Sequence, residues 1–209
     1  MSYFVIERGI MEQIDFNKIK VEQIKLNCND EQARKVYKNS FPVNERVPFK
    51  SLFEGVFKDF TLYGFYIDDV LTGFIHLLNA EDFVHLNYLA VAEGYRDKGI
   101  GSYIISWIKN KFDNKPLVAD VENVDFGAEN NSQRLQRLKF YYKNGFTDGV
   151  TEFDWEGTSM YYIHTNTISD EKFMEHIQIC FPTIKNLRPH KSNALEVQKY
   201  INNSCKIVD

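Results

Sequence analysis

The chain has 209 residues, of which 44% are hydrophobic and 15% aromatic, and its formal net charge is −4. This length suffices for one domain of ordinary size with extensions. The acidic balance argues against a protein that binds nucleic acid through a basic face. No stretch approaches the length and apolarity of a membrane span, and the charged N-terminal residues are unlike a signal peptide.

The three cysteines, Cys28, Cys180 and Cys205, lie far apart and form no C-x-x-C pair. Spacing of this kind suggests neither a zinc site nor a disulfide framework. We therefore expect reduced thiols, no bound metal and a cytoplasmic protein.

The first third of the chain predicts an extension, a strand and two helices. Residues 1–20 are weakly patterned and form the extension, and Ile24–Leu26 is the first candidate strand. Asn29 and Gln32 have the spacing of a capping box, which predicts the start of a helix. A second short helix is predicted over Phe49–Phe57.

Three apolar segments follow, over Phe60–Tyr66, Leu71–Leu78 and Phe83–Val91. Asp68 and Asp69 separate the first two, as in a hairpin. Strict alternation along the third segment would place its side chains on two opposite faces. One face would carry Val84, Leu86, Tyr88 and Ala90, and the other His85, Asn87, Leu89 and Val91.

The middle of the chain predicts an α/β unit. An amphipathic helix begins near Ile100, and Pro116–Val121 reads as a short buried strand. Ser132–Asn144 is predicted to be a helix that ends at Gly145. Its expected inward residues are Leu135, Leu138 and Tyr142.

A closing hairpin and two tail helices complete the predicted order. The hairpin joins Phe146–Trp155 to Ser159–Thr165, and the helices cover Ile168–Cys180 and Ala194–Ile201. We divide the chain into an N-terminal extension (1–20), one main α/β domain (21–166) and a C-terminal helical extension (167–209). A parallel step from 83–91 to 116–121 requires a right-handed crossover, so the sheet is predicted to be mixed.

The most informative motif lies between the third strand and the helix after it. Leu89–Val91 ends a strand, and Arg96-x-x-Gly99-x-Gly101 opens an amphipathic helix. Glycines at such a junction let backbone N–H groups approach a phosphate closely, and the helix N-terminus favours an anion. This context predicts a phosphate-binding turn.

Residues 89–102 resemble motif A of the GCN5-related N-acetyltransferases (GNAT), and Lys139–Phe146 resembles the Phe-Tyr-x-x-x-Gly-Phe element of the same family. The resemblance covers about residues 22–165. Ser40–Phe49 is similar to a stretch in a poorly characterised bacterial branch. The resemblance implies a three-layer α/β fold with a mixed, mostly antiparallel sheet that splays between its fourth and fifth strands.

The resemblance also implies that acetyl-CoA binds at the splay as cosubstrate. Backbone groups of Leu89 and Val91 would pair with pantetheine, and the Leu89 N–H would polarise the thioester carbonyl. The pyrophosphate would rest on N–H groups between Arg96 and Ser102. The expected cofactor-binding set is completed by Lys98, Gly99, Gly101 and, from the loop before the next helix, Asn131.

Acetyl transfer needs a proton acceptor for the amine and a proton donor for the leaving thiolate. Tyr141 matches the family tyrosine that serves as the acid. For the base, the sequence leaves open His85, Glu122 and a water chain without a single owner. Glu45 and Arg46, in a loop that lines the acceptor site in the family, and Asp120 are candidate substrate-binding residues.

We therefore expect an acetyl-CoA-dependent N-acetyltransferase that moves the acetyl group directly to a primary amine in a ternary complex. Acidic candidate residues favour a small cationic acceptor. The main alternative is a CoA-binding sensor or scaffold without catalysis, and a thioesterase-like or O-acyl activity is a third option. We expect a monomer or homodimer that binds neither nucleic acid nor membrane.

Overall fold

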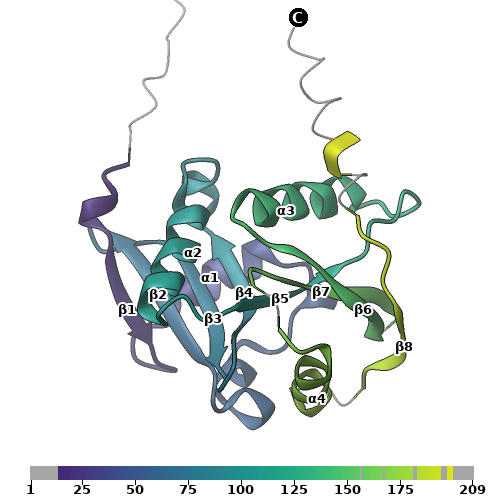
Figure 1. Cartoon of the computed structure of the whole chain (residues 1–209). Coiled ribbons are helices and arrows are strands. Elements are labelled where there is room, and N and C mark those ends of the chain that lie inside the picture. Colours follow the sequence, from purple (N-terminus) through teal and green to yellow (C-terminus); the bar gives the residue numbers. More distant parts are fainter. Residues whose placement is uncertain (1–13, 156, 167, 181–182, 194–196, 200–209) are drawn as a thin grey trace, which may run out of the picture.

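The computed structural model describes residues 14–155, 157–166, 168–180, 183–193 and 197–199. Eight strands of this part of the chain form one sheet in the order β1-β2-β3-β4-β5-β7-β6-β8 (Figure 1). The strands are β1 Lys20–Ile24, β2 Thr61–Ile67, β3 Val70–Asn79, β4 Val84–Val91, β5 Leu117–Glu122, β6 Thr147–Trp155, β7 Thr158–His164 and β8 Lys185–Pro189. The α-helices are α1 Glu31–Ser40, α2 Ile100–Lys111, α3 Asn131–Lys143 and α4 Asp170–Cys180. The 3-10 turns are η1 Phe16–Lys18, η2 Val43–Glu45, η3 Phe49–Phe53, η4 Gly55–Phe57 and η5 Glu93–Tyr95.

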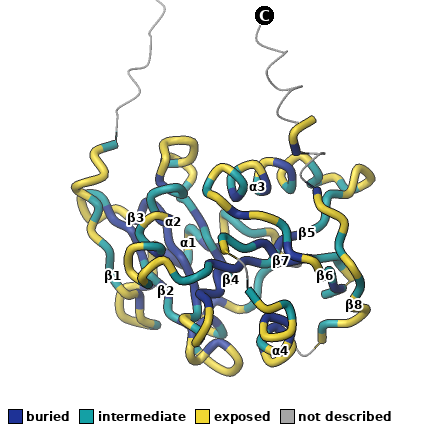
Figure 2. Tube along the Cα trace, viewed as in Figure 1, coloured by how far each residue is buried: buried dark blue, intermediate teal, exposed yellow. Residues whose placement is uncertain are grey.

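The helices form a layer on each face of this sheet. Helices α2 and α3 pack on one face, in a core that includes Ile104, Ile108 and Leu138. Helix α1 covers the opposite face over β2–β4, and α4 covers the same face further along, where Phe173 packs among buried side chains. The central strands are therefore buried on both sides, as the dark blue segments of Figure 2 show. The predicted three-layer α/β fold is confirmed.

The parallel strands β4 and β5 pair over only three residues each. Val84–Leu86 pair with Leu117–Ala119, and beyond this point the two strands have no mutual register. All other neighbouring strands in the sheet run antiparallel. The predicted splay between the fourth and fifth strands is thus present, and it leaves one edge of β4 open from Asn87 onward.

The predicted alternation along β4 is wrong because the strand contains a bulge at Asn87. His76 of β3 pairs with Tyr88, but the next residue, Leu77, pairs with Leu86, so Asn87 is an extra residue outside the β3–β4 register. A bulge of this kind shifts all later side chains to the other face. As a result Leu89 and Val91 pack with Val84 and Leu86 toward α2, whereas His85 shares the opposite face with Tyr88 and Ala90.

In α3 the buried tyrosine is Tyr141, whereas the sequence pattern predicted Tyr142. Tyr141 is buried with Leu135 and Leu138, and Tyr142 is only half-buried. The helix ends as predicted at Gly145, which has φ +87°. Its N–H donates to Tyr142 O, and the Phe146 N–H donates to Tyr141 O, which is a Schellman ending.

Three predictions at the N-terminal end are corrected. The first strand is β1, Lys20–Ile24, rather than Ile24–Leu26. Helix α1 begins one residue later than the capping box predicts, because the Gln32 side chain instead bonds the backbone of Asp69 and Leu71 across the β2–β3 turn. The predicted helix over 49–57 is two 3-10 turns, divided where Gly55 takes φ +61°.

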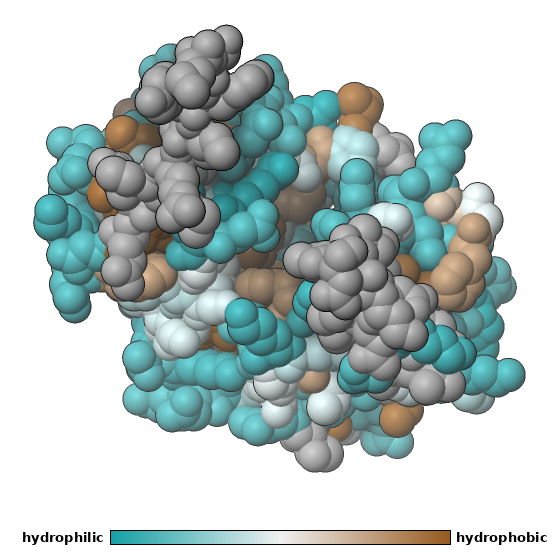
Figure 3. Space-filling view, turned by 90° about the horizontal axis from the view of Figure 1, so that it is seen from above, coloured by the Kyte–Doolittle hydropathy of each residue, from teal (hydrophilic) through white to brown (hydrophobic). Residues whose placement is uncertain are grey.

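The C-terminal part contributes to the sheet as well as to the helical layers. Helix α4 lies where a tail helix is predicted, but β8 pairs with β6 and extends the sheet by one strand. The predicted helix over 194–201 falls mostly outside the described residues. None of the described helices is both long and apolar enough to cross a bilayer. Figure 3 shows a mainly hydrophilic surface from above, with hydrophobic residues in a hollow near the centre.

Candidate active site

A cavity of about 630 Å³ lies where β4 and β5 part. Residues from most parts of the fold line it, and they include both apolar and charged side chains. They come from the α1–η2 region (Ser40, Phe41, Glu45, Val47), Phe57, β4 (87–91), Arg96, β5 (Asp120, Glu122), α3 (Gln133, Gln136, Arg137, Phe140, Tyr141), the β6–β7 hairpin (Phe153, Trp155, Thr158, Met160) and Ile184.

The open edge of β4 presents backbone hydrogen-bonding groups to this cavity. The Ala92 N–H donates to Thr72 O on β3, and residues of an antiparallel ladder alternate in direction. The backbone groups of Leu89 and Val91 therefore point away from β3, toward the splay. Arg96 Nε reaches Val91 O at 3.3 Å, which agrees with this direction. The structure thus places both predicted backbone sites on the cavity.

The predicted phosphate-binding turn joins β4 to α2. Gly99 has φ +87°, a conformation that side chains other than glycine rarely adopt, and the helix begins at Ile100. Gly101 serves close packing: a Cβ built there would lie 2.9 Å from the Phe140 ring, which lines the cavity. Sequence reasoning missed this contact because Phe140 belongs to another helix.

Two carboxylates of β5 face the cavity, and their surroundings differ. Glu122 is held by two guanidinium groups, Arg134 at 2.9 Å and Arg137 at 3.0 Å. Asp120 accepts a hydrogen bond from His85 Nε2 with its Oδ2 at 2.9 Å, and its Oδ1 is buried without a hydrogen-bond partner in the described part of the protein. The charge of Glu122 is therefore balanced by two arginines, whereas Asp120 has one oxygen without a hydrogen-bond donor in the described part of the protein.

His85 lies behind Asp120 and does not line the cavity. Its ring is fully buried, with Nε2 on Asp120 and Nδ1 3.0 Å from His176 Nε2. Burial, with a smaller contribution from the neighbouring His85, lowers the pKa of His176 to about 4. Burial likewise raises the pKa of the Cys180 thiol, beside His176, to about 11. Of the candidates that the sequence left open for the base, His85 reaches the cavity only through Asp120.

Tyr141 contributes the tyrosine side chain that α3 presents to the cavity. Burial raises its pKa to about 12, so the phenol keeps its proton at neutral pH. Tyr142 points elsewhere and donates a hydrogen bond to Asp148 Oδ1. The structure therefore places Tyr141, and not Tyr142, on the cavity.

The remaining predicted residues divide between the cavity and its surroundings. Glu45 lines the cavity, in a loop held to β4 by the Tyr88 hydroxyl, which donates to Glu45 O at 2.9 Å. Arg46 instead donates to Lys38 O, and Asn131 Oδ1 accepts the Asp125 N–H at 2.9 Å. Neither side chain lines the cavity, and the same holds for Lys98, Gly99, Gly101 and Ser102, which form the turn beside it.

Sequence reasoning missed most of the cavity wall that α3 provides. Its lining residues follow one helical face at positions 133, 136, 137, 140 and 141. This i, i+3, i+4 spacing could have been extended back from Tyr141. The apolar residues of the β6–β7 hairpin, such as Trp155 and Met160, carry no such signal, because the pairing of β7 with β5 alone brings them here.

The fold and the cavity together define an α/β protein with a splayed parallel strand pair that is open to a ligand. Residues 58–148 match a family model described as "Acetyltransferase (GNAT) domain". The match indicates a domain of this type over that part of the 209-residue chain. "Putative acetyltransferase YjbC" of Bacillus subtilis (strain 168) is 35% identical over 66 residues, which is 32% of each chain. The match thus spans about a third of the length of that curated relative.

Solved structures share the fold at low sequence identity. A Bacteroides thetaiotaomicron protein assigned to the GNAT family aligns with TM-score 0.58 and 22% identity, over 76% of this chain and 93% of its own. An Elizabethkingia anophelis GNAT acetyltransferase with acetyl-CoA bound has TM-score 0.52 and 19% identity, over 72% and 99%. Naa50 of Arabidopsis thaliana, in complex with a bisubstrate analogue of CoA, has TM-score 0.52 and 20% identity, also over 72% and 99%.

Proposed function

We propose that the protein transfers an acetyl group from acetyl-CoA directly to a primary amine while both substrates are bound. The observation that carries this proposal is one cavity in which the open β4 backbone, the Asp120 carboxylate and the protonated phenol of Tyr141 meet. These are a carbonyl-polarising donor, an ammonium partner and an acid, the groups that aminolysis of a thioester requires.

Acetyl-CoA fits the open edge of β4 and the turn after it. The Leu89 N–H points into the splay, where it would donate to the thioester oxygen as negative charge develops there. The pyrophosphate would lie at the N-terminus of α2, whose dipole favours an anion, with Arg96 beside it. A family neighbour with acetyl-CoA bound has the same fold, which supports this placement.

Asp120 is the group we assign to the acceptor amine. An alkylammonium has a pKa of about 10 and must lose a proton before it can attack. The Asp120 carboxylate would bind the ammonium and receive that proton, while the His85 N–H holds Oδ2 in position. His85 therefore acts as a positioning residue, and the Arg-paired Glu122 shapes the site.

The opposite wall of the cavity suggests the rest of the acceptor. Trp155, Met160 and Phe153 line it, and Thr158 adds a hydroxyl. A small amine with one cationic nitrogen and an apolar body would match this combination. Glu45 also lines the cavity, and its carboxylate lies 3.9 Å from the guanidinium group of Arg137.

Tyr141 completes the proposed reaction. The amine nitrogen bonds to the acetyl carbon, the carbon–sulfur bond breaks, and the CoA thiolate takes the phenolic proton. The raised pKa of Tyr141 keeps that proton available at neutral pH. The phenolate regains a proton from solvent after CoA departs.

The test is a panel of primary amines incubated with acetyl-CoA and the full chain. Free CoA thiol is measured over time, and the acetylated amine is identified by mass spectrometry, with a parallel panel of acyl-CoA donors. Amine-dependent CoA release with matching product supports the proposal. Tight CoA binding without turnover by any amine would favour a sensor, and CoA release without an amine would favour a thioesterase-like activity.

A further inference from the structure

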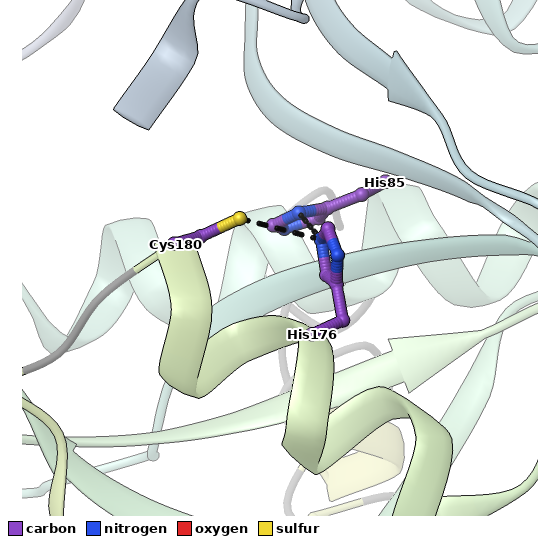
Figure 4. A group of neighbouring side chains, drawn as sticks. All are labelled: His85, His176 and Cys180. Carbon is purple, nitrogen blue, oxygen red and sulfur yellow. Dashed lines mark hydrogen bonds between the residues drawn. The ribbon is translucent and has the colours of Figure 1, made fainter. Parts of the chain in front are cut away.

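Three side chains of metal-binding type meet on the face of the sheet that α4 covers. His85 comes from β4, and His176 and Cys180 come from successive turns of α4 (Figure 4). His85 Nδ1 lies 3.0 Å from His176 Nε2, and Cys180 Sγ lies 3.6 Å from the same nitrogen. All three candidate ligand atoms lie within 4.8 Å of one another.

The two separations that involve His176 are close to the edges of a zinc coordination tetrahedron. Zinc binds imidazole nitrogen at about 2.0–2.1 Å and thiolate sulfur at about 2.3 Å, so tetrahedral angles place two nitrogens about 3.3 Å apart and a nitrogen and sulfur about 3.6 Å apart. The observed Cys180–His176 distance already has this value. The two imidazoles need to open by only a few tenths of an ångström.

Asp120 orients His85 as a ligand. It accepts the hydrogen bond of His85 Nε2, which fixes the ring proton on that nitrogen and leaves the Nδ1 lone pair directed at His176 and Cys180. A carboxylate behind a ligating histidine is the usual outer-shell partner in zinc sites. Asp120 lies on the far side of the ring from the cluster, so a metal ion would leave its contact with His85 in place.

We propose that His85, His176 and Cys180 bind one zinc ion, with solvent in the fourth position. Binding forms the zinc–sulfur bond and releases the thiol proton of Cys180 to solvent. His85 coordinates through the lone pair of Nδ1, and His176 coordinates through Nε2 after the proton on that nitrogen has moved to its Nδ1 by exchange with solvent. Two nitrogens and one thiolate suit zinc better than magnesium or calcium, which prefer oxygen ligands. The ion would tie α4 to β4 directly behind Asp120.

Cysteine spacing could not reveal this site. His85 and His176 lie 91 positions apart, and only the packing of α4 on the sheet brings them together. His176 and Cys180 are spaced i, i+4 on one helix, which places them on the same face. The competing arrangement is a hydrogen-bonded chain in which His176 donates to His85 and no metal binds.

The test uses the full chain, purified, treated with a chelator and dialysed. Zinc is added and its stoichiometry and affinity are measured by calorimetry and elemental analysis. Cobalt(II) is then substituted, because tetrahedral coordination with a thiolate gives intense ligand-field bands and a sulfur-to-metal charge-transfer band. We expect one zinc per chain, a zinc-dependent rise in Tm and the cobalt thiolate band.

The variants Cys180→Ser and His176→Gln should each lower zinc affinity by more than about 100-fold, beyond the usual effect of an outer-shell change. The matched control is Cys28→Ser, since Cys28 is exposed and remote in the fold. Circular dichroism verifies that each variant is folded. Absence of stoichiometric zinc, a cobalt spectrum without the thiolate band, or equal loss in Cys28→Ser would overturn the proposal. None of these readouts depends on acetyl transfer, so failure of the zinc proposal can be distinguished from failure of the proposed function.

Discussion

His85 Nε2 lies 2.9 Å from Asp120 Oδ2, so an imidazole without exposed surface is joined to the cavity through a single carboxylate. This relationship distinguishes the positions of Asp120 and His85 relative to the cavity, which the sequence alone could not distinguish. Asp120 reaches the cavity and has an unused oxygen, whereas His85 holds Asp120 from behind. A charge placed in this way is fixed before the substrate arrives, which lowers the cost of orienting it during the reaction.

Asp120→Asn should lower kcat/KM for the amine by about 10²- to 10⁴-fold, the range that a positioned proton acceptor contributes. The amide keeps the shape and can still accept the His85 hydrogen bond, but it neither attracts the ammonium nor takes its proton. Steady-state kinetics with saturating acetyl-CoA measures the effect, and CoA affinity should stay near that of the wild type.

The matched control for Asp120 is Glu122→Gln on the same strand. This change leaves the guanidinium groups of Arg134 and Arg137 without their carboxylate, so its main effect should be a loss of about 1–3 kcal/mol in the free energy of unfolding. If Glu122→Gln removed turnover in a stable protein while Asp120→Asn remained active, our assignment of the two carboxylates would be reversed.

The sequence predicts those features of the fold that local signals determine. Turn residues located the β2–β3 hairpin, where Asp68 and Asp69 adopt positive φ, and helical periodicity located α2. In both cases a few neighbouring residues decide the conformation. The splay was implied only by the family resemblance, and the short β4–β5 register confirms it.

Features that depend on distant partners were beyond this reasoning. The bulge at Asn87 follows from how β4 fits β3, and it reversed the expected faces of the second half of the strand. Strand β8 forms because β6 offers it an edge, and Arg188 on β8 pairs with Glu152. The position of His85 behind Asp120 likewise depends on the packing of three separate elements.

Tyr141→Phe should lower kcat by about 10- to 1000-fold with little change in KM for acetyl-CoA, because it removes a proton that is needed only as the thiolate leaves. Tyr142→Phe is the control one position along the helix. It removes the hydrogen bond to Asp148, so it should lower stability more than turnover. Rapid mixing with a thiol reagent follows CoA release, and unchanged kcat in Tyr141→Phe would exclude the phenol as the acid.

Gly101→Ala should weaken CoA binding by about 10-fold or more. The added Cβ would lie 2.9 Å from the Phe140 ring, and the ring can give way only by moving from its place in the cavity wall. Overpacking of this kind costs about 1–3 kcal/mol. The better helix propensity of alanine partly offsets this cost in the free energy of folding, but it does not offset the loss of CoA affinity. Calorimetry with CoA measures the effect.

The control for Gly101 lies in the same connection. A Cβ built at Gly94 meets nothing within 4 Å, and its backbone conformation is open to other residues. Gly94→Ala should therefore bind CoA as the wild type does. Equal CoA affinity in all three proteins would contradict the packing role that we assign to Gly101.

The last prediction concerns acid stability and the carboxyl group of Asp148 on β6. It accepts hydrogen bonds from the Ser192 hydroxyl at 2.6 Å, from the Asn193 N–H at 2.9 Å and from Tyr142. Burial alone would raise the pKa of Asp148, but these contacts and the nearby His190 outweigh it and lower the pKa. Tyr161 and His164 of β7 also interact electrostatically with it.

A lowered pKa in the folded state means that the ionised Asp148 stabilises the fold. This contribution is complete above the unfolded pKa of about 3.9 and is lost as pH falls from there through the folded value. Asp148→Asn should lower the free energy of unfolding by about 1.5–3 kcal/mol at neutral pH, the usual worth of hydrogen bonds to a charged group. The gap between variant and wild type should then shrink as pH falls below about 4. Urea unfolding between neutral pH and about pH 3 measures both curves, with the exposed Asp113→Asn as control. A gap that stayed constant with pH would mean that Asp148 stabilises the fold through its shape and not through its charge.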